Sequence, residues 1–154
     1  MRIINKLTLA LTLAVNIIAT CSCSSNRQGI TQSIKYSQAK NYFVLNTIDK
    51  SSFNVIGSQQ DFDALFGEAA TMGKNGEPTS IDFDKQSVIA VIMKPTDHPT
   101  IFETVSLVKK AQKITFNYKA IAEPKEVSYT MTPCLLIIVS KNDIEDSQIA
   151  FEKK

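Results

Sequence analysis

The chain has 154 residues, and its 17 basic and 15 acidic residues give a formal net charge of +2. This length suits one domain with a modest core rather than several domains. Basic runs never exceed two residues, which argues against nucleic acid as a partner and against a basic helix that lies on a membrane surface.

The N-terminus has the organisation of an export signal. Arg2 and Lys6 supply positive charge, and an apolar run follows over residues 7–19. These 13 residues are too few to cross ~30 Å of hydrocarbon, which takes about 20 residues. The pattern therefore predicts a removable signal peptide over residues 1–20 rather than a membrane span or a buried helix.

The junction Ile18-Ala19-Thr20-Cys21 resembles bacterial lipoprotein signals, in which the cysteine carries lipid and becomes the first mature residue. Ile18 and Ala19 stand where that pattern expects them, so Cys21 is the predicted lipidation site and membrane anchor. Cys23, preceded by Ser22, is the alternative, and a plain secretory signal with incidental cysteines is another. By the same resemblance, Ser22 after the lipidated residue implies the outer membrane of the bacterial cell envelope, facing the periplasm.

Removal of the signal changes the charge of the chain. It deletes Arg2 and Lys6 from the 17 basic residues and no acidic residue, which leaves 15 of each sign. The next segment, residues 21–40, is rich in Ser, Gln, Asn and Thr and poor in apolar residues, so it predicts a lipid-anchored flexible tether. A single β-rich domain is then expected over residues 41–154.

The first expected elements of this domain are a strand and a short helix. Residues 42–45 predict the strand. Ser58 is a suitable N-cap with Asp61 three residues later, and apolar residues follow at helical spacing. Gly67 is a natural C-cap. We therefore expect a helix over about residues 58–66.

The rest of the chain predicts a loop over residues 68–80 and then mainly strands. Strands are expected over residues 87–93, 101–108, 114–118, 127–131, 135–139 and 149–151, with a hairpin turn over residues 109–113. The strands at 87–93 and 135–139 are apolar on both faces and should be central. The predicted fold class is α+β: a mostly antiparallel β-sheet or a sandwich-like domain with one short N-terminal helix.

Several segments together resemble one known family. They are Ile56 to Phe66, Ile81 to Val91, Val105 to Lys110, Ile114 to Tyr118, and Thr132-Pro133 with the apolar strand that ends at Ser140-Lys141. This order resembles the C-terminal domain of the PrcB-like accessory lipoproteins, which are named for a subunit of a bacterial surface protease complex. The resemblance implies a small β-rich domain that binds protein, including a protease, without catalysis of its own.

One pair of residues could in principle carry catalysis. His98 is the chain's single histidine, and it could serve as a base for Cys134 if Asp97 or Asn117 oriented its ring. However, Cys134 begins an apolar strand, where a cysteine behaves as a small buried hydrophobe. We therefore predict no catalytic residue and no enzyme activity.

Three aspartates could supply oxygen ligands to a cation. Asp82 and Asp84 are close in sequence, and Asp97 follows after the next strand. The Asp82–Asp84 segment lacks the glycine and the distal glutamate of an EF-hand loop. Capping of turns explains these aspartates better, and neither a metal nor a cofactor is expected.

Loops are the most suitable carriers of binding residues on a rigid sheet. The segments 68–80 and 94–100 are the irregular ones, and their predicted partner-binding residues are Met72, Lys74, Asn75, Asp97, His98 and Pro99. The sequence thus predicts a lipid-anchored, noncatalytic protein-binding module of the cell envelope, either an accessory or an inhibitor subunit of a protease. The alternative is a periplasmic lipoprotein that binds a small molecule or a carbohydrate.

Overall fold

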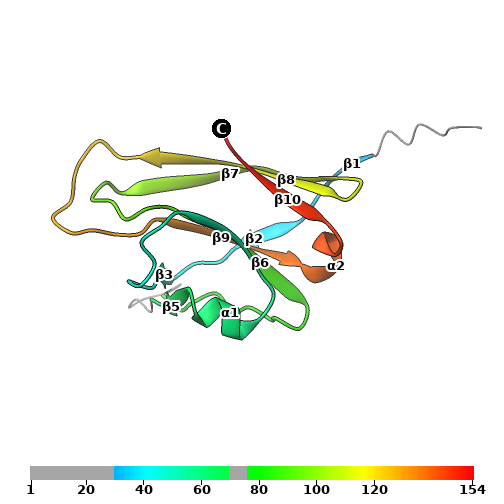
Figure 1. The fold of residues 1–154 in the computed structure, drawn as a ribbon, viewed down its shortest axis with the longest axis horizontal. Coiled ribbons are helices and arrows are strands. Elements are labelled where there is room, and N and C mark those ends of the chain that lie inside the picture. Colours follow the sequence, from blue (N-terminus) through cyan, green and yellow to red (C-terminus); the bar gives the residue numbers. More distant parts are fainter. Residues whose placement is uncertain (1–29, 70–75) are drawn as a thin grey trace, which may run out of the picture.

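The computed structural model describes residues 30–69 and 76–154, and these form three stacked layers (Figure 1). The first sheet has the order β1 (Thr31–Ser33), β7 (Thr100–Lys110), β8 (Lys113–Ala122) and β10 (Gln148–Lys153). The second sheet has the order β2 (Tyr36–Gln38), β9 (Cys134–Ser140), β6 (Gln86–Ile92) and β4 (Ser52–Ile56). The third layer holds α1 (Gln59–Asp63) and the pair β3 (Tyr42–Val44) and β5 (Phe66–Glu68).

The pairing is antiparallel throughout these sheets except between β8 and β10, which run parallel. The short helix α2 (Lys141–Ile144) follows β9 in the second sheet and leads to β10 in the first. The fold is therefore mostly β-strand and rich in antiparallel pairs, like a β-sandwich with a small extra layer, which agrees with the predicted fold class in its coarse form. No helix among the described residues is long and apolar enough to span a bilayer.

The middle position of the second sheet explains why β6 and β9 are apolar on both faces. Ile89 and Val91 of β6 belong to the core between the two sheets. Val88 and Ala90, on the opposite face, belong to a second core beneath α1, β3 and β5. The prediction that both strands are central is confirmed, because each has a strand on either side and a packed layer on either face.

The helix α1 begins as its sequence indicates but ends early. The Ser58 hydroxyl accepts a hydrogen bond from the Asp61 backbone N–H at 3.1 Å and donates one to the Asp61 carboxylate at 2.7 Å. The helix ends at Asp63, and Ala64 occupies the C-cap. The prediction of Gly67 as a C-cap is wrong, because Gly67 lies in β5 opposite Phe43.

The prediction of a flexible tether up to residue 40 is wrong for residues 31–33 and 36–38, which form the strands β1 and β2. β1 pairs with β7 and β2 pairs with β9. The side chains of both strands are exposed, so polar residues suit them, and the backbone holds them in place. The apolar residues between and after them, Ile34 and Ala39, are buried in the two cores. The domain thus begins about ten residues earlier than the composition suggested, and residues 21–29 lie outside the described part of the chain.

Three further segments test the predictions for the strands and their turn. Residues 127–131 are not a strand, since only an isolated bridge joins Met131 to Thr96. The hairpin turn expected at 109–113 is present as Ala111 and Gln112 between β7 and β8, with Ala111 at a φ of 55°. The edge strand expected near Ile149 and Phe151 is β10.

Candidate functional site

The central strand pair β6 and β9 ends in a concave region on each side. At one end Ile92 pairs with Cys134, and at the other Gln86 pairs with Ser140. Each end carries a pocket of about 630 Å³. These two pockets differ in their lining, and that difference decides what each can bind.

The pocket at the Cys134 end is a groove whose mixed lining includes exposed aromatic side chains. One wall comes from residues 42–49, and the other comes from Pro95, residues 129–132 and Cys134. Phe43 is 47% exposed and Tyr129 is 61% exposed, one from each wall. We call this region the aromatic groove. Exposed aromatic residues in a concave surface are typical of protein-binding sites, where rings are buried against a partner.

The wall with Phe43 is held rigidly by the third layer. The Tyr42 ring packs edge-on against Phe62, with centroids 5.0 Å apart. The Tyr42 hydroxyl donates to the Thr79 carbonyl oxygen at 2.7 Å. Burial, and then the charges of Glu68 and Asp63, raise the pKa of Tyr42, so its hydroxyl stays protonated and can keep donating. The groove wall is therefore preformed.

Phe43 itself rests on a glycine. A Cβ added at Gly67 would lie 2.5 Å from Cζ of the Phe43 ring. Gly67 and Phe43 face each other in the β3–β5 pair. The absence of a side chain at Gly67 therefore leaves the space that the tip of the Phe43 ring occupies.

The predicted binding turn, residues 94–100, is joined to the opposite wall of the groove. Thr96 and Met131 exchange two backbone hydrogen bonds, both 2.8 Å long. The carbonyl oxygen of Asp97 accepts from the Val127 N–H at 2.8 Å, and that of Pro99 accepts from the Glu123 N–H at 2.7 Å. Asp97, His98 and Pro99 thus belong to the same pair of loops as Tyr129.

His98 links this turn to residues 123–126. Its Nδ1 lies 3.0 Å from the Glu123 carbonyl oxygen, which can only accept, so Nδ1 carries the proton of that bond. Its Nε2 lies 3.8 Å from the Asp97 carboxylate and 3.7 Å from the Glu126 carboxylate. The ring therefore contacts backbone and carboxylates of its own loop pair.

Cys134 is a free thiol with the character of a core residue. Burial raises its pKa to about 11, so very little thiolate exists near neutral pH, and the thiolate is the nucleophilic form. Its side chain packs against the core beneath the third layer. Among the described residues, His98 has no hydrogen bond or ion pair with Cys134 or Asn117, and Asn117 instead donates to the Ser106 hydroxyl at 2.9 Å.

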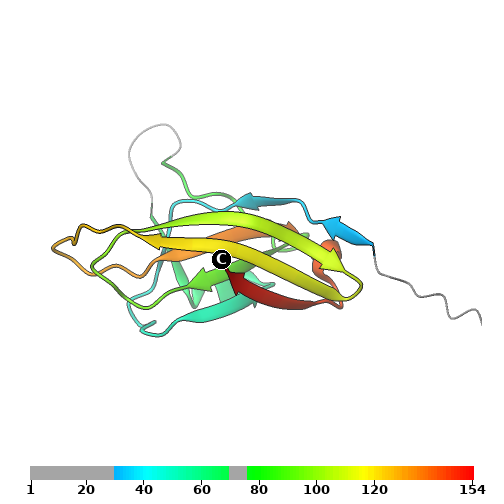
Figure 2. The same ribbon diagram turned by 90° about the horizontal axis from the view of Figure 1, so that it is seen from above.

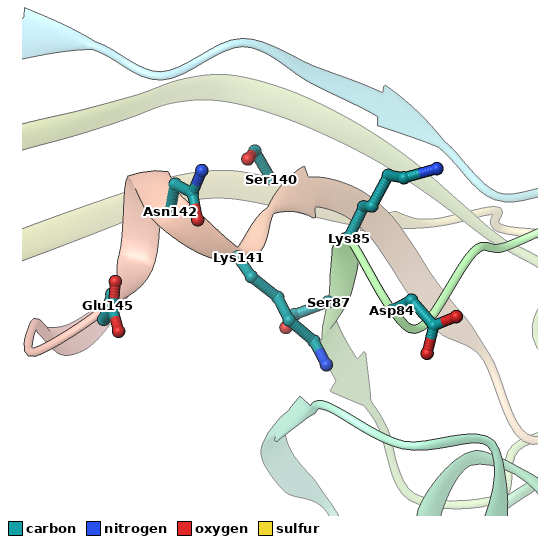
Figure 3. Close-up of a pocket in the computed structure, with 7 residues that line it drawn as sticks. All are labelled: Asp84, Lys85, Ser87, Ser140, Lys141, Asn142 and Glu145. Atoms are coloured by element: carbon teal, nitrogen blue, oxygen red, sulfur yellow. The ribbon is translucent and has the colours of Figure 1, made fainter.

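The pocket at the Ser140 end is polar, and we call it the polar cleft (Figure 3). It is lined by Asp84, Lys85, Ser87, Ser140, Lys141, Asn142 and Glu145. Figure 3 shows Lys141 reaching from the start of α2 toward Ser87 on β6. The lining contains two lysines and two carboxylates, so its charges sum to zero. It contains no aromatic side chain.

The aspartates near the polar cleft stabilise a turn. The Asp82 carboxylate accepts from the Asp84 N–H at 3.1 Å and lies 3.1 Å from Lys85 Nζ. The hydrogen bond from Lys85, followed by that from the Asp84 backbone, lowers the pKa of Asp82. Asp97 lies at the other end of the sandwich, and no three His, Cys, Asp or Glu residues of the described chain gather as a metal site would require.

Some predicted site residues cannot be placed. Cys21, Cys23, Met72, Lys74 and Asn75 lie outside the described residues. The sequence pattern does not mark Phe43 or Tyr129 as a binding residue. Phe43 was assigned to a strand and Tyr129 to another, and strand aromatics usually point into a core. The alternation beside the buried Val44 could have placed Phe43 on the outer face.

Comparison with known proteins gives no match: no family model, no curated protein and no solved structure is similar to this chain. The likeness to the PrcB-like domain therefore remains an expectation from the sequence.

Proposed function

We propose that this chain is a lipid-anchored, noncatalytic protein-binding module of the bacterial cell envelope, and that the aromatic groove receives the partner. The observation that carries the proposal is that two exposed rings, Phe43 at 47% and Tyr129 at 61%, both line one groove. Rigid aromatic anchors in a concave surface contribute most of the affinity in many protein interfaces. The N-terminal signal pattern supports export and anchoring.

The position of the groove suits a tethered domain. The described chain begins beside β1, which pairs with the end of β7 next to the β7–β8 hairpin. Lys109 at that end donates to the Asp143 carbonyl oxygen in α2, so the chain starts near the polar-cleft end. The groove lies at the other end of β6 and β9. An N-terminal lipid anchor would therefore leave the groove accessible.

The resemblance to the PrcB-like lipoproteins suggests the type of partner. A protease or another subunit of an envelope protease complex would offer an extended chain or a loop, and a groove between two walls fits such a segment. In this proposal the module acts as an accessory or as an inhibitor without a catalytic residue of its own.

Site-specific photocrosslinking in intact cells tests the proposal. A photoreactive phenylalanine analogue at Tyr129 or Phe43 of the full-length lipoprotein should form a defined adduct with an envelope protein. The same analogue at Asn142, in the polar cleft, is the positional control. Adducts at Asn142 alone would contradict a partner in the groove.

Matched substitutions give a second test of the groove. Tyr129→Ser and Phe43→Ser should reduce recovery of the crosslinked partner by about tenfold or more, as loss of an aromatic anchor does. Tyr36→Ser is the control, because Tyr36 is 42% exposed but lies on β2, outside the groove. Equal loss in all three variants would argue against a specific groove contact.

Metabolic labelling with a fatty acid tests the anchor. We expect the label to be lost in Cys21→Ala and retained in Cys23→Ala. Loss only in Cys23→Ala would move the lipid to the alternative residue. If neither the native protein nor the variants take up the label, the proposed lipid anchor is contradicted. That result does not affect the groove proposal, which the crosslinking experiments test.

A second candidate function rests on the polar cleft. Ser87 is 4% exposed, its side chain lines the cleft, and no partner for its hydroxyl is found among the described residues. A hydroxyl with free bonding capacity that lines a cleft suits a small polar ligand such as a carbohydrate. Binding of a sugar that Ser87→Ala and Lys141→Ser abolish, and that Tyr129→Ser leaves unchanged, would favour this alternative.

A further inference from the structure

The edges of the two sheets are unequally protected against pairing with another chain. β1 and β2 are only three residues long. β10 ends in Glu152 and Lys153, with Lys154 following. Short length and charge are the usual means by which an edge strand avoids pairing. β4 has neither: its five residues, Ser-Phe-Asn-Val-Ile, include no charge, no proline and no glycine.

β4 also has a free outer side. It is the last strand of the second sheet and pairs only with β6. Among the described residues, no hydrogen bond outside that ladder engages the backbone of residues 52–56. A row of backbone donors and acceptors is therefore available for one more strand.

Apolar side chains line this edge. Phe53 and Val55 are 52% and 49% exposed. They pair with Val91 and Ile89, so they lie on the face that looks toward the first sheet. The Phe53 ring stacks on Phe151 of β10, with centroids 4.6 Å apart, and Figure 2 shows β4 and β10 along the same side of the molecule. This contact holds Phe53 in place with half of its surface uncovered.

We propose that β4 pairs antiparallel with β4 of a second copy of this chain, about a two-fold axis at Asn54, and joins the two second sheets into one of eight strands. In this register Phe53 lies opposite Val55 of the second copy, and Val55 lies opposite its Phe53. Ser52 lies opposite Ile56, and Asn54 lies opposite itself. Each aromatic thus meets a β-branched residue on the same face, one of the favourable cross-strand combinations.

A second copy suits this edge better than an unrelated strand. With the axis at Asn54, the two exposed apolar residues Phe53 and Val55 of each copy oppose one another in two equivalent pairs, as a two-fold interface requires. The edge carries no charge, so it brings no repulsion against its own copy and no ion pair to select a different partner. β1, where the described chain begins, lies on the opposite side of the molecule from β4 (Figure 2), so the pairing leaves both N-termini free.

Cysteine crosslinking in the full-length lipoprotein tests this register directly. Opposed residues in an antiparallel pair have Cα atoms about 4.5–5.5 Å apart, within the range that a disulfide spans. In a Cys23→Ser background, Asn54→Cys should give a covalent dimer under mild oxidation. Glu152→Cys on the β10 edge is the matched control and should remain monomeric. No dimer from Asn54→Cys, or more dimer from Glu152→Cys, would overturn the proposal.

The mass of the detergent-solubilised full chain gives the second test. Val55→Lys places a charge at the interface and should raise the dimer dissociation constant by about tenfold or more. Val105→Lys is the control, because Val105 is also 49% exposed but lies on β7 in the first sheet. Circular dichroism confirms that both variants fold. The proposal would be overturned if the dimer survived Val55→Lys or if only Val105→Lys dissociated it. A wild-type protein that is monomeric at every concentration would also overturn it.

Discussion

The aromatic groove and the polar cleft lie at opposite ends of the same two strands and have the same volume, about 630 Å³. They differ in what supports them. The groove wall of residues 42–49 is part of the third layer and is backed by the core around Phe62. The cleft is bordered by α2, a helix of four residues with no buried side chain.

This difference shows how one sheet can offer two kinds of surface. Where a packed layer supports the strand ends, exposed rings can be held in fixed positions, which lowers the entropy lost on binding. Where only a short helix borders them, charged residues of both signs line the surface and no aromatic ring does. The groove is therefore the better candidate for a macromolecular partner, and four predictions test the contrast.

Loss of the support beneath the groove should have the largest effect. Phe62 is 2% exposed and contacts the rings of Tyr42, Phe66 and Phe83 at centroid distances of 5.0, 5.0 and 5.6 Å. Phe62→Ala should lower the free energy of unfolding by about 3–5 kcal/mol, because it leaves a cavity in the core. Chemical denaturation measures this loss.

Two controls accompany this measurement. Phe43→Ala, at a half-exposed ring of the same groove, should cost much less. NMR spectra of Phe62→Ala should show amide shifts concentrated at residues 42–49 and few at residues 141–145. Equal shifts at both ends would mean that the two regions are not supported independently.

The thiol in the groove wall should make stability depend on pH. Burial raises the pKa of Cys134 from 9.0 to about 11, so the folded state keeps a proton that the unfolded chain loses. This contribution is fully present below pH 9 and is lost as the pH rises toward 11. The free energy of unfolding of the wild-type protein should fall by about 2–3 kcal/mol over that window relative to Cys134→Val.

Denaturation of both proteins at several pH values measures this difference, since ionisation of tyrosines and lysines affects both alike. Parallel curves would show that the thiol is not protected.

The sequence predicted the central strands well because their signal is strong. Residues 87–93 and 135–139 are continuous apolar runs, and only a strand with both faces covered needs such a run. The N-cap of α1 was equally readable, since Ser58 and Asp61 interact within four residues.

Elements that depend on distant partners were not readable in the same way. β1 and β2 are polar strands that exist because β7 and β9 offer them backbone hydrogen bonds. Gly67 was expected at a helix end, but it pairs with Phe43 across a strand pair that no local pattern reveals. The groove escaped prediction for the same reason, because its two walls are about 80 residues apart in the chain.

The third prediction tests the position of one groove ring. Gly67→Ala places a methyl group 2.5 Å from Cζ of Phe43, so the ring must turn or the strand pair must shift. Overpacking of this kind costs about 1–3 kcal/mol, and we expect the lower part of that range because half of the ring faces solvent.

Partner crosslinking through Phe43 should fall, while the amide chemical shifts of residues 141–145 stay unchanged. Gly57→Ala is the control, because the nearest side-chain atom to an added Cβ there is 3.9 Å away. Unchanged crosslinking would indicate that the ring orientation is not set by Gly67.

The smallest effect is expected at the polar-cleft end, in the pair between Asp82 and Lys85. The hydrogen bond from Lys85 is the main cause that lowers the pKa of Asp82 below its ordinary 3.8. The stability it contributes is present above pH 3.8 and is lost as the pH falls through the lowered pKa. Both side chains are largely solvated, so Lys85→Met should leave the unfolding midpoint at neutral pH almost unchanged.

The carboxyl titration of Asp82, followed by NMR, is the sensitive readout for this pair. In Lys85→Met the pKa of Asp82 should rise toward 3.8 but stay below it, because the Asp84 N–H still donates to the carboxylate at 3.1 Å. Lys154→Met is the matched control: it removes the partner that lowers the pKa of Glu152 and should leave Asp82 unaffected. If Asp82 kept its full shift without Lys85, the backbone of the turn alone would hold that carboxylate, and Lys85 would have no part in fixing the turn beside the polar cleft.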